Sequence, residues 1–154
     1  MTHANSAETP GLLWQDELCR VTAAEFCSWP GYLILRLNGA ERSLAELSGA
    51  EAAALGRALA RTARALECVT GAERVYLLSF AEVDRQLHFH LLPRTRILAQ
   101  CWATACGQSP RDAVDGPALF QWVRATCVTE ADLPDGLPPR EDVLAALRRE
   151  LVPA

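Results

Sequence analysis

The chain has 154 residues, of which 50% are hydrophobic and 22% are charged. This length and composition predict one folded domain with its own apolar core and argue against long disordered segments. The formal net charge of −4 excludes the broad basic surface that nonspecific binding to long DNA or RNA requires, so any phosphate group must be bound by a local set of residues.

Residues 1–11 predict a flexible tail, because they are mostly small and polar and end in Pro10-Gly11. They have neither the basic start nor the apolar core of a secretion signal, and no apolar run in the chain approaches the length of a membrane span. The six cysteines include no Cys-x-x-Cys pair, so free thiols are expected rather than a zinc site or disulfides. We therefore expect a cytoplasmic protein with a single domain over residues 12–154, no membrane contact, and no metal or cofactor.

Two strands are predicted early in the chain. A short strand is expected from Arg20 to Thr22 and a longer one from Gly31 to Leu37. The longer strand follows Trp29-Pro30 and ends at Asn38-Gly39, which is typical of a turn. Trp29 and Tyr32 are expected to be core residues.

The longest predicted element is a helix from Ser48 to about Thr70. Ser48 and Glu51 have the spacing of a capping box at the amino end, and Gly71 is expected to end the helix. Its apolar residues recur at helical spacing, whereas its arginines fall on the other side and are interpreted as a solvated face rather than a phosphate site. The predicted apolar stripe consists of Leu55, Leu59, Thr62, Leu66 and Val69.

Two more strands and two more helices are predicted in the second half. Strands are expected over residues 74–80 and 87–92, and because only a short polar stretch separates them they should be antiparallel neighbours. Residues 95–115 contain glycine and proline and predict irregular structure. Helices are expected from Pro117 to about Cys127 and from Pro139 to Leu151.

The strand at residues 87–92 contains the residues that best indicate a function. Side chains alternate between the two faces of a strand, so Gln86, His88 and His90 should share one face while their apolar neighbours face the core. Arginines at positions 85, 94 and 96 bracket this row and predict a local site for a small anion such as a phosphate.

Two neighbouring imidazoles are chemically suited to phosphate chemistry. Imidazole is nucleophilic when neutral and titrates near pH 7, so a positioned histidine can attack phosphorus or transfer a proton. Two other interpretations stay open for His88 and His90. They can be hydrogen-bonded residues under a loop, which is the more common case for a His-x-His pair, or they can bind a metal, although no third ligand is evident.

Residues 86–94 resemble the signature of the histidine-triad (HIT) nucleotide-binding proteins, in which three histidines alternate with apolar residues on a strand. The resemblance to bacterial members covers most of Trp14 to Cys127, and here the triad is degenerate, Gln-x-His-x-His. It implies an α+β fold with an antiparallel sheet of about five strands, packed with a long helix, and C-terminal helices. It also implies a homodimer in which the sheet continues across a two-fold axis. The wider similarities are residues 29–32, 43–48, 70–76 and 116–122.

The same resemblance implies roles for individual residues. His88 would attack the α-phosphorus of a nucleotide to form a covalent nucleotidyl-histidine, His90 would contact the phosphate, and the main-chain carbonyl of Gln86 would orient His88. Four more residues are candidates for binding a small nucleotide or other phosphate-containing ligand. They are Asn38, Arg85, Arg94 and Trp102, and for Trp102 a hydrophobic anchor is favoured over a base-stacking role.

The chain departs from the family pattern at several positions. Gln86 replaces the first histidine, Ala40 replaces a supporting histidine, and residues 81–85 lack a glycine and add the negative charge of Asp84. An amide cannot deliver a proton, so an active enzyme should favour nucleoside polyphosphates over phosphoramidates. We favour a nucleotidyl hydrolase or transferase over a binding module that has lost turnover. A plain interaction protein would leave the strand histidines without a role.

Overall fold

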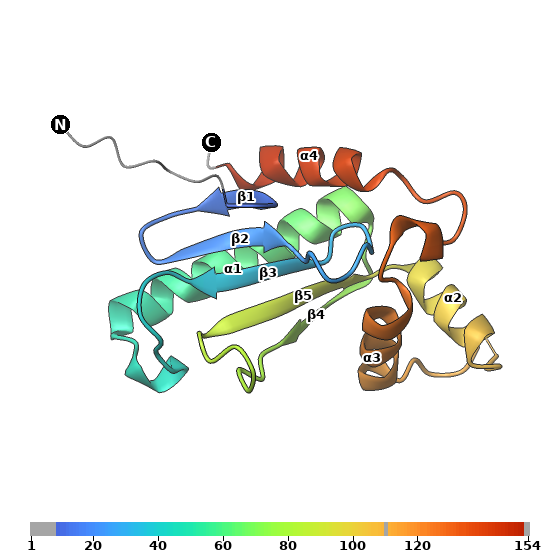
Figure 1. Ribbon diagram of the computed structural model, residues 1–154, viewed down its shortest axis with the longest axis horizontal. Coiled ribbons are helices and arrows are strands. Elements are labelled where there is room, and N and C mark those ends of the chain that lie inside the picture. The colour runs from blue at the N-terminus through green and yellow to red at the C-terminus, as the bar shows by residue number, and fades with distance from the viewer. Residues whose placement is uncertain (1–8, 110, 153–154) are drawn as a thin grey trace.

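The sheet of the computed structural model, which describes residues 9–109 and 111–152, is antiparallel with the strand order β1-β2-β3-β5-β4 (Figure 1). Strand β4 lies at one edge and β1 at the other, so β3 and β5 are paired on both sides. The strands are β1 (Leu12–Gln15), β2 (Cys19–Ala23), β3 (Leu33–Leu37), β4 (Arg74–Leu78) and β5 (His88–Arg94).

Four α-helices accompany the sheet within the described residues. They are α1 (Gly49–Thr70), α2 (Arg96–Ala105), α3 (Gly116–Thr126) and α4 (Arg140–Leu151), with short 3-10 helices at Leu44–Glu46 and Glu130–Asp132. Figure 1 shows α1 running behind the sheet, α4 beside β1, and α2 and α3 together at one end. No helix in the described part of the chain is long and apolar enough to cross a membrane.

Helix α1 begins and ends where the sequence predicts. The Ser48 hydroxyl accepts a hydrogen bond from the Glu51 amide, and the Glu51 carboxylate accepts one from the Ser48 amide. Gly71 follows the helix with a φ of 67°, a left-handed conformation that glycine adopts with little strain. The predicted stripe is confirmed, since Leu55, Thr62 and Leu66 are buried and Leu59 and Val69 pack against the core.

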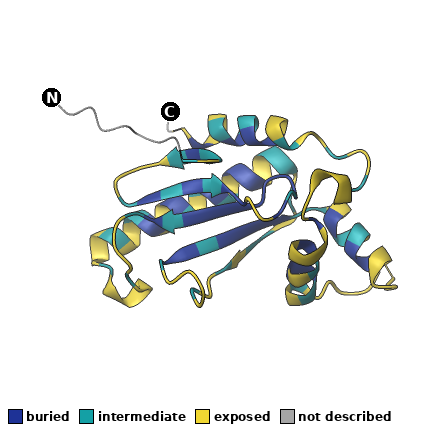
Figure 2. Ribbon diagram, in the orientation of Figure 1, coloured by how far each residue is buried: buried dark blue, intermediate teal, exposed yellow. Residues whose placement is uncertain are grey.

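Two apolar clusters hold the fold together. One lies between the sheet and helices α1 and α4, and it includes Leu35, Leu66 and Leu147. The other joins the loop after β2 to α2 and α3, and it includes Trp29, Leu92 and Phe120. Figure 2 shows the central strands largely buried and the loops and outer helix faces exposed. The sheet is therefore covered on one face by α1 and at one end by α2 and α3.

The expected α+β class, with a sheet of about five strands against a long helix, is confirmed. The prediction of irregular structure over residues 95–115 is wrong, because Arg96–Ala105 form α2. The Thr95 hydroxyl caps this helix by accepting from the Leu98 amide, and Leu98 and Trp102, one turn apart, bury the same face. The glycines and prolines that suggested a loop all come after the helix.

Two further predictions concern the amino end and the cysteines. Strand β1 was not predicted, because its four residues are too few to show a clear alternation. Residues 1–8 of the predicted tail lie outside the described residues, whereas the carbonyl of Gly11 accepts a hydrogen bond from the Ala23 amide. All six cysteines are free thiols, and three of them, Cys19, Cys27 and Cys127, are buried.

Candidate functional site

The pairing of β3 with β5 brings the candidate side chains together. Its register places His88 opposite Arg36 and His90 opposite Ile34. Because side chains alternate along each strand, these four lie on the face of the sheet that α1 does not cover. The predicted alternation is confirmed, since the apolar neighbours in the core on the α1 side are Leu87, Phe89 and Leu91.

A pocket of about 350 Å³ lies in front of the two imidazole rings. Its walls are residues 80–84 of the loop before β5, Phe26 of the loop after β2, and Arg124 of α3. His88 and His90 are each only 7% exposed, so the rings form the floor of the pocket rather than a free surface. The two ring centroids are 5.2 Å apart.

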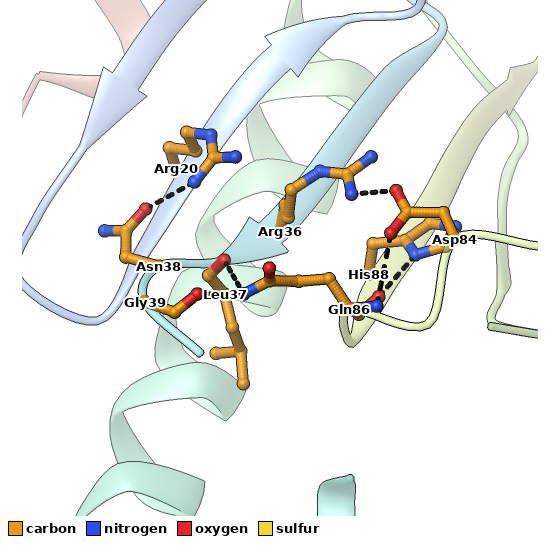
Figure 3. A network of polar contacts seen from close by, with 8 residues as sticks. All are labelled: Arg20, Arg36, Leu37, Asn38, Gly39, Asp84, Gln86 and His88. Atoms are coloured by element: carbon orange, nitrogen blue, oxygen red, sulfur yellow. Dashed lines mark hydrogen bonds and ion pairs between the residues drawn. The ribbon is translucent and has the colours of Figure 1, made fainter. Parts of the chain in front are cut away.

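The ring of His88 is oriented by the main chain. Its Nδ1 atom lies 2.7 Å from the carbonyl oxygen of Gln86, the contact that the family resemblance implied (Figure 3). A carbonyl oxygen can only accept a hydrogen bond, so Nδ1 carries the proton. In the neutral ring the lone pair is then on Nε2, which is the nitrogen a nucleophilic histidine needs.

The side chain of Gln86 does not point into the pocket. Its amide nitrogen donates to the carbonyl oxygens of Leu37, at 2.8 Å, and Gly39, at 3.1 Å (Figure 3). These carbonyls lie where β3 ends, and the amide supplies hydrogen bonds that the sheet no longer provides. The expected row of one amide and two imidazoles is therefore reduced to the two imidazoles.

His90 is held by a residue that the sequence placed only in the core. The Tyr32 hydroxyl lies 2.9 Å from His90 Nδ1, and Tyr32 is 1% exposed. Burial, reinforced by the charges of His88, Arg124 and Arg36, lowers the pKa of His90 from 6.5 to about 4. His90 is therefore neutral near pH 7. When Nδ1 accepts a hydrogen bond from the Tyr32 hydroxyl, the neutral ring carries its one proton on Nε2. That Nε2–H can donate a hydrogen bond to a phosphate oxygen.

Arg36 and Asp84 form an ion pair at the mouth of the pocket (Figure 3). Asp84 also accepts a hydrogen bond from the main-chain N–H of Gln86, at 3.2 Å. The Arg36 hydrogen bond, more than any other contact, lowers the pKa of the Asp84 carboxyl, which therefore stays ionised. The negative charge that Asp84 adds beside an anionic ligand is thus balanced by Arg36.

The loop before β5 has an unusual backbone at Ala81, which has a φ of 52°. This left-handed conformation is common for glycine and costs a residue with a Cβ about 1 kcal/mol. The loop lacks the expected glycine but still adopts a conformation that favours one. Ala81 lines the histidine pocket, so the strain lies at the candidate site.

Arg85, Arg94 and Trp102 lie outside the histidine pocket. Arg85 lines a neighbouring pocket of about 470 Å³, while Arg94 and Trp102 line a third one of about 290 Å³. Arg94 forms an ion pair with Glu73. Four strand residues span about 13 Å, so Arg94 lies well beyond His90 on the same face.

Asn38 anchors a turn instead of facing the pocket. Its side-chain amide nitrogen donates to the Asp16 carbonyl, at 2.9 Å. Its side-chain oxygen accepts from Arg20, at 2.8 Å (Figure 3). The first contact joins the end of β3 to the turn between β1 and β2, and the second joins it to β2 itself. Across the described residues, no group of three or more His, Cys, Asp or Glu side chains could hold a metal ion.

Several residues that line the pocket were not identified from the sequence, and two of them are arginines. Arg36, Arg124 and Phe26 come from three different segments, and only the tertiary structure brings them to the histidines. Arg124 and Phe120 are four residues apart in a predicted helix, so the sequence already indicated that they share one face of it. It did not indicate that this face lies beside His90.

Comparisons with known proteins agree on the architecture. No protein-family model matches the sequence, and no curated protein matches it. A solved histidine triad protein of Bradyrhizobium japonicum is 19% identical, with a TM-score of 0.59, over 99% of this chain and 98% of that chain. A histidine triad protein of Sinorhizobium meliloti is 22% identical, with a TM-score of 0.55, over 89% of this chain and 84% of that chain.

A third solved structure is a hypothetical histidine triad nucleotide-binding protein of Sulfolobus tokodaii. It is 12% identical, with a TM-score of 0.57, over 93% of this chain and 84% of that chain. At these identities the likeness concerns the fold. The chain therefore has the fold of the histidine triad proteins.

Proposed function

We propose that this protein is a nucleotide-binding member of the histidine triad family and binds the phosphate of a nucleotide in front of His88 and His90. Support comes from the fold, from a solved neighbour named as nucleotide-binding, and from a pocket of about 350 Å³ at the two histidines. A ligand of small size also fits the net charge of −4, which disfavours a long nucleic acid.

We further propose a hydrolase that acts through a covalent intermediate on His88. The Nε2 lone pair attacks the α-phosphorus, a P–N bond forms, and the P–O bond to the leaving group breaks with its electron pair on the leaving oxygen. Water then attacks the same phosphorus and loses a proton, and the P–N electrons return to Nε2. The observation that carries this proposal is the 2.7 Å contact between His88 Nδ1 and the Gln86 carbonyl, which leaves Nε2 as the nucleophilic nitrogen.

A second candidate is a binding module without turnover. It is favoured by Gln86, whose side chain is occupied by the carbonyls of Leu37 and Gly39 and has no acidic proton. His90 is neutral near pH 7, so it too is a weak source of protons. Both facts leave a leaving group without an evident acid at the site.

Mass spectrometry separates the two candidates. The intact protein is incubated with a panel of nucleotides and dinucleoside polyphosphates, and its mass is compared with that of His88→Ala treated in the same way. A nucleotidyl adduct that is absent from His88→Ala is expected for the enzyme. Binding by calorimetry without adduct or turnover would support the binding module, and no binding of any nucleotide would reject both.

The missing acid also predicts substrate preference. A polyphosphate leaves as a stable anion, whereas the nitrogen of a phosphoramidate must be protonated before it leaves. The enzyme should therefore hydrolyse a dinucleoside polyphosphate faster than an adenosine phosphoramidate under the same conditions. Faster cleavage of the phosphoramidate would refute this reasoning and would require a proton donor elsewhere in the pocket.

We also propose that the protein is a cytoplasmic homodimer that pairs along β4. This strand lies at the edge of the sheet, and its Leu77 is 50% exposed. An edge strand with an exposed apolar side chain can pair with another strand, and a lysine there opposes such pairing. Light scattering should give twice the mass of one chain for the wild type and a lower mass for Leu77→Lys. A monomeric wild type would reject the dimer.

A further inference from the structure

Arg124 is held at the rim of the histidine pocket by two aromatic rings. Its guanidinium carbon lies 5.0 Å from the ring centroid of Phe26 and 5.6 Å from that of Phe120. The same two rings pack beside His90, with centroid distances of 6.0 Å and 5.9 Å. The two rings that pack beside His90 therefore also contact the Arg124 guanidinium. These contacts restrict the Arg124 side chain to the region next to His90.

The charges of the pocket single out Arg124. Four lining residues other than the histidines are ionisable: Arg36, Glu82, Asp84 and Arg124. Arg36 and Asp84 neutralise each other in an ion pair. No ion pair within residues 9–109 and 111–152 joins Arg124 to a carboxylate. Arg124 is therefore the cation with free hydrogen-bond donors, and Glu82 is the charge that opposes it.

The histidines and Arg124 are suited to different parts of a ligand. A neutral imidazole such as that of His90 can donate a hydrogen bond to a phosphate group but adds no charge to balance it. A guanidinium can bind a phosphate through two parallel N–H donors, and each such charged hydrogen bond is stronger than a neutral one. A ligand with one phosphate in front of His88 and a second one further out would use both.

We infer that Arg124 binds the second phosphate of the ligand, so that the pocket selects nucleoside diphosphates and polyphosphates over monophosphates. This inference rests on the proposed nucleotide site and adds a specificity-determining residue to it. Glu82 then lowers the affinity for the same ligand, since its carboxylate repels the second phosphate. Two substitutions in one pocket should consequently change affinity in opposite directions.

Calorimetric titration of five proteins tests the inference. The wild type and four variants are each titrated with adenosine monophosphate, adenosine diphosphate and inorganic pyrophosphate. The variants are Arg124→Gln, Arg124→Lys, Glu82→Gln and Arg149→Gln. Arg149 is an exposed residue of α4, so its variant has the same net charge as Arg124→Gln without touching the pocket. A thermal melt confirms that each variant is folded.

The expected pattern depends on the ligand. Arg124→Gln should weaken diphosphate and pyrophosphate binding about tenfold, the effect of losing one charged hydrogen-bonded pair, and monophosphate binding about twofold at most. Glu82→Gln should tighten diphosphate binding, and Arg149→Gln should match the wild type. Arg124→Lys keeps the charge without the paired donors, so its diphosphate affinity should lie between those of wild type and Arg124→Gln.

Several outcomes would overturn the inference. Equal weakening of monophosphate and diphosphate by Arg124→Gln would mean that Arg124 contacts the base or the first phosphate. If Arg149→Gln weakened diphosphate binding as much as Arg124→Gln does, the loss of affinity would reflect the net charge of the protein and not a contact of Arg124. If the wild type binds no nucleotide, the proposed function fails, and pyrophosphate alone decides: binding lost in Arg124→Gln supports the anion site, whereas binding retained there or absent from the wild type rejects it.

Discussion

The neutral state of His90 predicts that the fold loses stability as the pH falls. The pKa of this ring is about 4 in the folded protein, against an ordinary value of 6.5 that applies to the unfolded chain. Below the higher value the unfolded chain binds a proton that the folded protein does not. The contribution of His90 to stability is therefore complete above about pH 6.5 and is lost progressively as the pH falls towards about 4.

The magnitude follows from these two pKa values. Proton linkage gives a loss of about 2 kcal/mol in the free energy of unfolding between pH 7 and pH 5. For a domain of this size, such a loss lowers Tm by roughly 4 to 8 °C. Hydrogen bonds from arginine keep the pKa values of Glu73 and Asp84 below their ordinary range, so these two carboxylates titrate outside the window.

Urea unfolding followed by tryptophan fluorescence measures this loss in the wild type and in His90→Gln. Glutamine can still accept a hydrogen bond from the Tyr32 hydroxyl, but it does not titrate. The wild type should lose about 2 kcal/mol more than the variant between pH 7 and pH 5. An equal loss in the two proteins would refute the reasoning, as would an NMR titration of the folded protein that gives His90 its ordinary pKa.

Three further substitutions test contacts of the site and the fold. Tyr32→Phe removes the hydroxyl at 2.9 Å from His90 and should lower the free energy of unfolding by about 1 to 2 kcal/mol in urea, and an unchanged value would deny that bond a role. Ala81→Gly removes the strain of the left-handed backbone and should raise the free energy of unfolding by up to about 1 kcal/mol, which a higher Tm would report. A fall in Tm would contradict the assigned strain. Ser48→Ala removes the cap of α1 and should cost about 1 kcal/mol, whereas Thr9→Ala serves as a matched change outside any helix.

Local sequence patterns predicted much of the fold and the floor of the site. Alternation along residues 87–92 was enough to separate His88 and His90 from their apolar neighbours, because strand geometry alone decides which face a side chain takes. The ends of α1 were equally predictable, since a capping box and a C-terminal glycine act within a few residues.

The walls of the pocket were not predictable in the same way. Arg36 faces His88 only because β3 pairs with β5, and more than fifty residues separate the two positions along the chain. Arg85 and Arg94 looked better placed because they flank the histidines in sequence, yet strand length carries Arg94 away and the loop turns Arg85 into another pocket. Tyr32 was correctly predicted as buried, but nothing local to it indicated a partner on β5.

The atom that orients His88 belongs to the peptide backbone, and every amino acid at position 86 would supply it. Substitution of Gln86 can remove its side-chain hydrogen bonds to the carbonyls of Leu37 and Gly39 at the end of β3. The orientation of the His88 imidazole would be unchanged. The orientation of His88 therefore does not depend on a histidine at position 86. If His88 is the nucleophile that we propose, a search that requires three alternating histidines would overlook proteins that keep this oriented ring with a different residue two positions before it.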